Sequence, residues 1–301
     1  MIMPAPQRLA RAGALGLSML LSTTIAGLAI EGVSVLPDRS RVASVGGSIT
    51  EIVYALGEEG ALVARDSTSV YPEAALKLPD VGYMRALSPE GVLSVNPSGI
   101  LALEGSGPKE ALDVLKKASV PFISVPEGFT HEGIVEKVRV VGKALGADTK
   151  ADTLAAEIDK QLSDAEALTK DIPQAERKRV LFILSMQGGK ILASGSSTAA
   201  DGIITMAGGI NAVEGFSGYK QLTDEAAITA KPDIILMMDR EGQLAIGDAD
   251  LYAHPAIAST PAGQAKKVIR MDGAYLLGFG PRTASAIKDL VVSLYGDAVK
   301  K

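Results

Sequence analysis

Short apolar runs alternate with amphipathic segments along the chain from about residue 41 onward. In the first half, the apolar runs predict strands at 41–47, 61–66, 98–103 and 121–126, and the amphipathic segments predict helices at 48–57, 88–97 and 108–119. Strands that alternate with helices are typical of a parallel sheet covered on both faces.

The second half repeats this pattern. It predicts strands at 179–185, 233–238 and 266–272, and helices at 198–209, 223–232 and 283–296. Between the halves, residues 149–170 carry Leu154, Ile158, Leu162 and Leu168 at helical spacing with charged flanks. A helix of that length would extend about 33 Å.

Two segments resemble each other internally. "GYMRALSPEGVLSVNPSGILAL" begins at Gly82 and "GYKQLTDEAAITAKPDIILMM" begins at Gly218. Both contain a Ser or Thr that can cap a helix, a glutamate two residues later, a proline, and an apolar strand. This repeat predicts two similar lobes, and a cleft between lobes is a common place for a ligand.

We therefore predict an α/β fold of two Rossmann-like lobes with parallel sheets, joined by a long rigid helix, with the ligand in the cleft between the lobes. The predicted boundaries are 38–145 for the N-terminal lobe, 146–175 for the linker helix and 176–301 for the C-terminal lobe.

Residues 1–30 have the features of a cleaved signal peptide. Arg8 and Arg11 precede an apolar stretch at 12–30. Small residues near Ala26 and Ala29, toward the end of this stretch, could be recognised by a signal peptidase. A single membrane anchor is the alternative, but Ser22, Thr23 and Thr24 interrupt the apolar stretch. The mature protein is therefore expected outside the cytoplasm.

Composition narrows the chemistry. The net charge of −5 offers no basic surface for nucleic acid. The absence of cysteine excludes disulfides, thiolate metal sites and a lipid-modified cysteine, and two histidines are too few for a multi-histidine zinc site. Both histidines, His131 and His254, are expected at the surface.

Tyr71 occupies an unusual place in the stretch "DSTSVYPEAALKLPDVGYMRALSPEG", residues 66–91. The residues around it are small, polar or turn-forming, so the segment predicts an exposed loop. From the sequence alone, Tyr71 could pack on Pro72 or could bind a ligand.

The signal peptide, the two lobes, the helical linker and the paired Ser/Thr-x-Glu helices resemble the helix-linked class of periplasmic substrate-binding proteins, which serve importers of cobalamin, iron-siderophores and haem. Within that class, the Tyr71 loop together with "LLGFGPRT" (276–283) resembles the periplasmic haemin-binding proteins of bacterial haem importers. The resemblance covers nearly all of the mature chain and implies that ferric protoporphyrin IX is the transported ligand.

This resemblance implies that Tyr71 ligates the haem iron. A phenolate is a hard anionic ligand suited to ferric iron, and tyrosine is an established axial haem ligand. A nearby guanidinium would favour the phenolate. Arg85 and Arg282 are the candidates, and we expect Arg85 because it belongs to the same lobe as Tyr71.

Other haem contacts are expected from both lobes. Some relatives use a histidine of a "HGG" turn, where this chain has "SMQGG". Gln187 stands at that position with Met186 beside it, so five-coordinate haem or a weak second contact is expected and a second stacked haem is in doubt. The remaining candidates are Tyr83, Met84, Tyr219, Lys220 and, for a propionate, Arg282.

Glu90 and Glu225 occupy matched positions in the repeat. In the helix-linked class, one glutamate of each lobe docks into arginine pockets of a permease dimer. The resemblance therefore implies an inner-membrane ABC permease with its ATPase as the partner, and an outer-membrane haem receptor in the same uptake system. The helix dipole would also favour a carboxylate at these positions without any partner.

Two alternatives stay open. A ferric-siderophore or cobalamin carrier would share the fold, although such sites tend to need several basic residues or several aromatics, and aromatics make up only 4% of this chain. A secreted hydrolase is the second alternative. "ASGSSTA" (193–199) offers serines, but it lacks the Gly-x-Ser-x-Gly pattern of a nucleophile elbow, so no enzyme activity is expected.

Overall fold

The N-terminal lobe is built on a parallel sheet in the order β2-β1-β3-β4. The computed structural model describes residues 1, 33–240, 242 and 245–299; apart from Met1, the predicted signal peptide lies outside them. The central strands are buried along their whole length, as expected where helices cover both faces of a sheet. The elements of this lobe are β1 (Val42–Val45), α1 (Gly47–Ala55), β2 (Leu62–Arg65), α2 (Pro89–Leu93), β3 (Gly99–Leu103), α3 (Lys109–Lys117), β4 (Phe122–Val125) and α4 (His131–Ala144), with 3-10 turns at Glu59–Ala61 and Glu73–Lys77.

The C-terminal lobe has a mixed sheet in the order β10-β9-β5-β6-β8, with β7 paired to β5. Its elements are β5 (Arg179–Gln187), β6 (Lys190–Ser194), α6 (Ala199–Met206), β7 (Ile210–Asn211), β8 (Tyr219–Leu222), α7 (Asp224–Ala230), β9 (Ile234–Asp239), α8 (Asp248–Ala253), α9 (Pro255–Ala258), α10 (Pro261–Gln264), β10 (Val268–Asp272), α11 (Gly273–Leu277) and α12 (Thr283–Tyr295).

The prediction of a wholly parallel sheet is wrong for this lobe, because β6 runs antiparallel to both β5 and β8. The cause is local. Gly188 and Gly189 both have positive φ, 56° and 74°, and this conformation closes a two-residue hairpin between β5 and β6.

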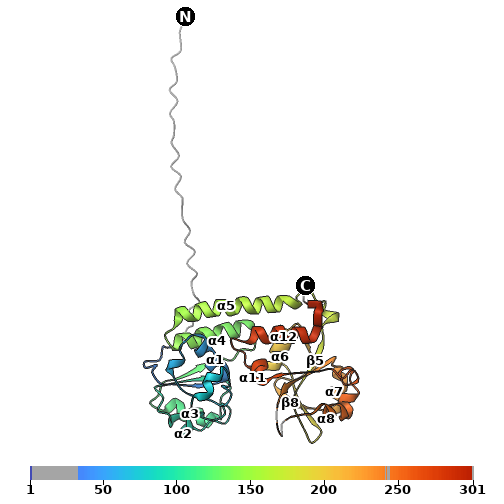
Figure 1. Cartoon of the computed structure of the whole chain (residues 1–301), viewed down its shortest axis with the longest axis horizontal. Helices are drawn as coiled ribbons and strands as arrows, with labels where there is room; N and C mark the ends of the chain where they lie inside the picture. The colour runs from blue at the N-terminus through green and yellow to red at the C-terminus, as the bar shows by residue number, and fades with distance from the viewer. Residues whose placement is uncertain (2–32, 241, 243–244, 300–301) are drawn as a thin grey trace. The chain divides into compact units, whose positions relative to one another are not determined.

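Helix α5 (Asp148–Glu166) follows the N-terminal lobe and has 19 residues, so it is about 28 Å long. Figure 1 shows it beside α4 and α12, and it packs against both of these helices. Ile158 and Leu162 are buried on its inner face, whereas Leu168 lies beyond its end in a 3-10 turn (Ala167–Thr169) and is exposed. None of the helices formed by the described residues is both long and apolar enough to span a membrane.

The internal repeat is confirmed at the level of local structure. Ser88 caps α2 by accepting a hydrogen bond from Gly91 N, and Thr223 caps α7 by accepting one from Ala226 N. At matched positions after these helices, Asn96 and Lys231 both adopt a left-handed conformation, with φ of 47° and 44°. Each precedes a proline and a buried strand. Equivalent capping and stop signals therefore produce equivalent helix-to-strand turns in the two lobes.

Candidate functional site

Hydrogen bonds to one buried carboxylate fix the loop that carries Tyr71. Asp66 directly follows β2 and is fully buried. Its oxygens accept hydrogen bonds from Gly46 N (3.0 Å), Thr68 N (3.1 Å) and Ser69 Oγ (2.8 Å). These bonds fix the start of the loop, while Tyr71 at its far end is 46% exposed and accessible to a ligand.

Arg282 of the other lobe lies on the Tyr71 ring. The guanidinium carbon is 3.8 Å from the ring centroid, which is within the range of a cation–π contact. A second ring, that of Tyr275, lies 5.3 Å from the same carbon. The Tyr275 hydroxyl donates a hydrogen bond to Asp289 at 2.8 Å. Arg282 therefore contacts two tyrosine rings, one of them anchored to α12.

Glu51 fixes the orientation of Arg282. Arg282 Nε donates to Glu51 Oε2 at 3.0 Å and Nη2 donates to Oε1 at 2.6 Å, which makes a bidentate pair. The Glu51 side chain is only 8% exposed. Its pKa is raised because burial penalises the carboxylate more than Arg282 favours it. The pKa of Arg282 is also raised, because Glu51 and Tyr71 together outweigh its own burial.

Arg85 has a different partner from the one we expected. It donates from Nη1 to the Tyr83 hydroxyl at 3.0 Å, and both side chains are exposed. The guanidinium that lies against Tyr71 is thus Arg282, which is separated from it by 211 residues (282 minus 71) in the sequence. Membership of the same lobe was a poor guide, since contacts between lobes bring distant residues together.

Tyr219 lies at the start of β8 and is directed toward the start of α6. Its ring is 6.3 Å from that of Phe182. Burial raises the pKa of Tyr219, and the neighbouring Thr198 side chain, the Ala200 backbone and the charge of Arg85 oppose that rise. Tyr219 is therefore tied to the C-terminal lobe and lies near Arg85.

Three expected haem contacts have other surroundings in the structure. Met84 is 5% exposed and belongs to the core of the N-terminal lobe. Met186 packs against the core of the C-terminal lobe, as a gap-filling methionine does. Lys220 Nζ lies 5.4 Å from the Phe216 ring, on the strand face opposite Tyr219. Gln187, next to Met186, is exposed at the tip of the β5–β6 hairpin.

The two histidines are less exposed than predicted. The His131 side chain is 15% exposed and lies 3.0 Å from Asp159 Oδ1 and 3.2 Å from Glu166 Oε2, both on α5. Burial lowers the pKa of His131, but these two carboxylates raise it above its ordinary value overall. His254 is 9% exposed, and its Nε2 lies 2.8 Å from Gly189 O. Both residues therefore have structural partners.

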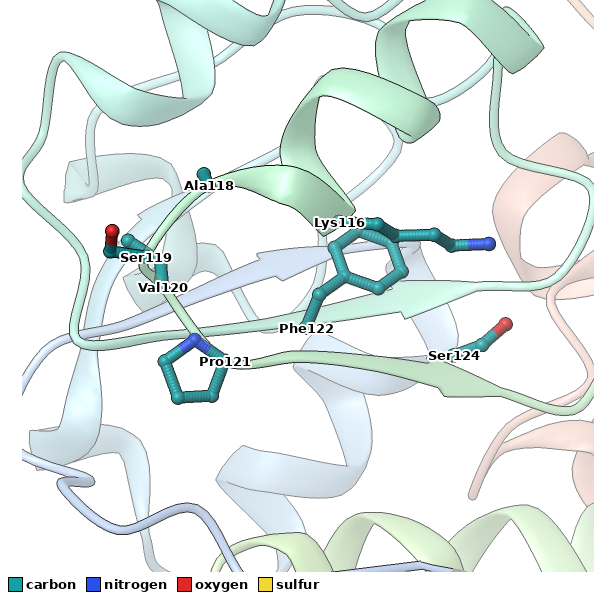
Figure 2. Close-up of a pocket in the computed structure, with 7 residues that line it drawn as sticks. All are labelled: Lys116, Ala118, Ser119, Val120, Pro121, Phe122 and Ser124. Carbon is teal, nitrogen blue, oxygen red and sulfur yellow. The ribbon is translucent and has the colours of Figure 1, made fainter.

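A pocket of about 450 Å³ lies at the edge strand β4 and the end of α3. Lys116 and Phe122 are among the residues that line it (Figure 2), and Lys116 Nζ is 5.6 Å from the Phe122 ring. A second pocket of about 350 Å³ is lined by Met186, His254 and Asp250, among others. Tyr71 and Arg282 line neither of these pockets.

Three residues of the site region were not predicted: Glu51, Lys137 and Tyr275. Two of them carried a signal in the sequence. Glu51 is the only charged residue of an otherwise apolar and small-residue helix, Gly47–Ala55. Lys137 falls on the apolar face of α4, three residues after Ile134 and four before Val141. A charge in such a place is rarely buried without a partner, and this could have marked both positions.

The structure has two lobes, a helix that packs against both, and an exposed tyrosine on a fixed loop. These features define the class of the protein, a helix-linked substrate-binding protein. The chain belongs to the periplasmic binding protein family, whose model matches residues 42–275. The predicted family and α/β fold class are therefore confirmed. Proteins of this family bind substrates for transporters.

Three relatives indicate the range of the family. The solved periplasmic haem-binding protein BhuT, in complex with two haems, is 39% identical with a TM-score of 0.80, over 86% of this chain and 98% of that one. The uncharacterised ABC transporter substrate-binding lipoprotein YvrC of Bacillus subtilis (strain 168) is 28% identical over 90% of this chain and 85% of that protein. The vitamin B12-binding protein of Yersinia pestis (strain Pestoides F) is 28% identical over 68% of this chain and 71% of that protein.

Proposed function

We propose that this chain binds ferric haem through the Tyr71 phenolate in the periplasm and delivers it to an ABC importer. The main support is the contact between two side chains. Tyr71 is exposed on a fixed loop, and the half-buried guanidinium of Arg282 stacks on its ring. The haem-binding relative is also more similar to this chain, at 39% identity, than the vitamin B12-binding relative, at 28%.

The chemistry of the site suits a ferric porphyrin. A phenol has an ordinary pKa of about 10, so a phenolate at neutral pH needs nearby positive charge. Ferric iron supplies most of that charge, and Arg282 adds to it from the ring face. Arg85 and Tyr83, both exposed beside the loop, could meet a propionate and the porphyrin edge, because guanidinium groups pair well with carboxylates. Since glutamine is a weak iron ligand, we infer that the iron is five-coordinate or has only a weak second contact from Gln187.

The experiment that tests this function compares ligands. Purified mature protein titrated with ferric haemin should give a high-spin tyrosinate absorption spectrum that saturates at about one haem per chain. Cyanocobalamin under the same conditions should give no saturable binding. Tight binding of cobalamin would contradict the proposal. A haemin spectrum that is the same with the protein as in buffer alone would also contradict it.

The two arginines make separable predictions. Arg282→Ala should raise the pH at which the tyrosinate spectrum appears, because it removes a positive charge that favours the anion. Arg85→Ala should move this midpoint much less, because Arg85 bonds to Tyr83 instead. Absorption spectra of the two haem-loaded variants across pH would measure the difference. A larger shift for Arg85→Ala would return the supporting role to Arg85.

Delivery to the importer is proposed to depend on Glu90 and Glu225. Both are exposed in the first turns of α2 and α7, the two helices of the confirmed repeat. A permease with two related subunits would present a matching pair of basic sites. Residues 1–30 are proposed to act as a cleaved signal peptide. Because the chain has no cysteine, it cannot carry the lipid-modified cysteine of a lipoprotein.

A further inference from the structure

The loop that carries Arg282 is held by a buried ammonium of the other lobe. Lys137 of α4 is fully buried. Its Nζ donates to Phe279 O at 3.0 Å, across 142 residues of sequence, and to Glu127 Oε1 at 2.6 Å. Ser48 Oγ lies 3.4 Å from the same nitrogen. A buried charge requires partners, and this one has an acceptor in each lobe.

Phe279 has a conformation that requires support. It is a non-glycine residue with φ of 49°, in the left-handed region, which is unfavourable for residues that carry a Cβ. Its ring is 1% exposed and lies edge-on to Phe129, with centroids 5.2 Å apart. Gly202 of α6 packs closely against both phenylalanines. A Cβ added to Gly202 would lie 3.1 Å from the Phe279 ring and 2.4 Å from Phe129 O. The carbonyl of Phe279 is thereby directed at Lys137.

The first turn of α1 completes the support. Ser48 and Glu51 lie one turn apart on this helix, and Glu51 holds Arg282 while Ser48 contacts Lys137. Gly280, between Phe279 and Arg282, approaches Ser48 so closely that an added Cβ would lie 3.3 Å from the Ser48 Cβ. Both ends of the segment 279–282 are therefore linked to α1. Phe279 is linked to Ser48 through Lys137, and Arg282 bonds directly to Glu51.

We propose that Lys137 is a positioning residue of the ligand site: by holding Phe279 O, it seats the 279–282 segment so that Arg282 lies on Tyr71 before the ligand arrives. This inference rests on the proposed function, because it assigns the purpose of the contact to the Tyr71 site. The hydrogen bonds of Lys137 are made to Ser48, Glu127 and Phe279 rather than to Tyr71. Burial lowers the pKa of Lys137, and the Glu127 carboxylate opposes that shift.

The test uses a paired substitution, because Lys137→Met alone would leave Glu127 buried without its cation. Lys137→Met with Glu127→Gln removes both charges and keeps similar volumes. Lys109→Met with Asp113→Asn is the matched control, since it removes an exposed lysine–carboxylate pair of the same lobe. Thermal unfolding followed by circular dichroism would establish that both proteins fold.

The first readout needs no haem. Amide hydrogen exchange of the unliganded protein, followed by mass spectrometry, should show faster exchange in peptides that cover 280–286 for the Lys137/Glu127 variant. The variant loses the hydrogen bond from the charged Lys137 to Phe279 O. Such a bond stabilises enough that the protection of these amides against exchange should fall by about tenfold or more. Peptides that cover β3 and all peptides of the control should be unchanged. Unchanged protection at 280–286 would overturn the positioning role.

The second readout tests whether Lys137 acts through Arg282. The Lys137/Glu127 variant should raise the pH midpoint of the tyrosinate spectrum in the wild-type background, and should add nothing once Arg282→Ala is present. Around Arg282, the titratable groups are Glu51, Asp272, Tyr71 and Tyr275, none of which the variant changes. Equal shifts with and without Arg282, or no shift at all, would overturn the proposal. If the wild-type protein fails to bind haemin, the proposed function fails, whereas the exchange experiment still decides whether Lys137 seats the segment.

Discussion

Tyr71→Phe is expected to reduce haemin affinity by on the order of 100-fold or more and to abolish the tyrosinate spectrum, because it removes the one oxygen proposed to bind the iron. The fold should be unaffected, since the Tyr71 ring is 46% exposed and the loop is held by Asp66 rather than by Tyr71. Absorption titration with haemin measures affinity and spectrum together.

Tyr83→Phe is the matched control. Tyr83 is exposed to a similar extent, 43%, and its hydroxyl accepts a hydrogen bond from Arg85. Its loss should leave the tyrosinate spectrum in place and weaken binding at most modestly. If Tyr71→Phe retained the wild-type spectrum, or if Tyr83→Phe lost it, the assignment of Tyr71 as the iron ligand would be wrong.

Replacing both Glu90 and Glu225 with alanine is expected to separate binding from transport. Neither residue takes part in the Asp66 hydrogen bonds or in the Arg282–Glu51 pair, so haemin affinity should stay at the wild-type value. Haem-stimulated ATP hydrolysis by the reconstituted importer should fall. Each lost contact should cost between at most about 1 kcal/mol for an exposed ion pair and roughly 2–5 kcal/mol for a desolvated one.

The control for this pair is Glu110→Ala with Glu132→Ala. These glutamates are also exposed in first helical turns, of α3 and α4, but they are not part of the repeat. Their loss should leave ATP hydrolysis unchanged, while rising salt should slow the wild-type reaction by screening the docking charges. Normal transport by the Glu90/Glu225 variant, or a parallel loss of haemin binding, would exclude the docking role.

Features that depend on neighbouring residues could be predicted before the fold was known. Helix caps such as Ser88 and Thr223 accept hydrogen bonds from amides three residues away, so they could be recognised without the fold. Alternation of apolar strands and amphipathic helices gave the α/β class and the two lobes. The Tyr71 loop was evident from its small, polar and turn-forming residues, because such a segment cannot form a buried strand.

Contacts between distant side chains depend on the packing of the whole fold. Arg282 rather than Arg85 lies on Tyr71, because the contact is made between lobes and sequence distance carries no information about it. Met186 and Gln187 lie on opposite faces of the sheet because strand side chains alternate, and the hairpin register decides which of them is in the core. Lys137 could be buried only because Phe279 O and Glu127 come from different parts of the fold to bond its ammonium, and that compensation has no trace in the local sequence.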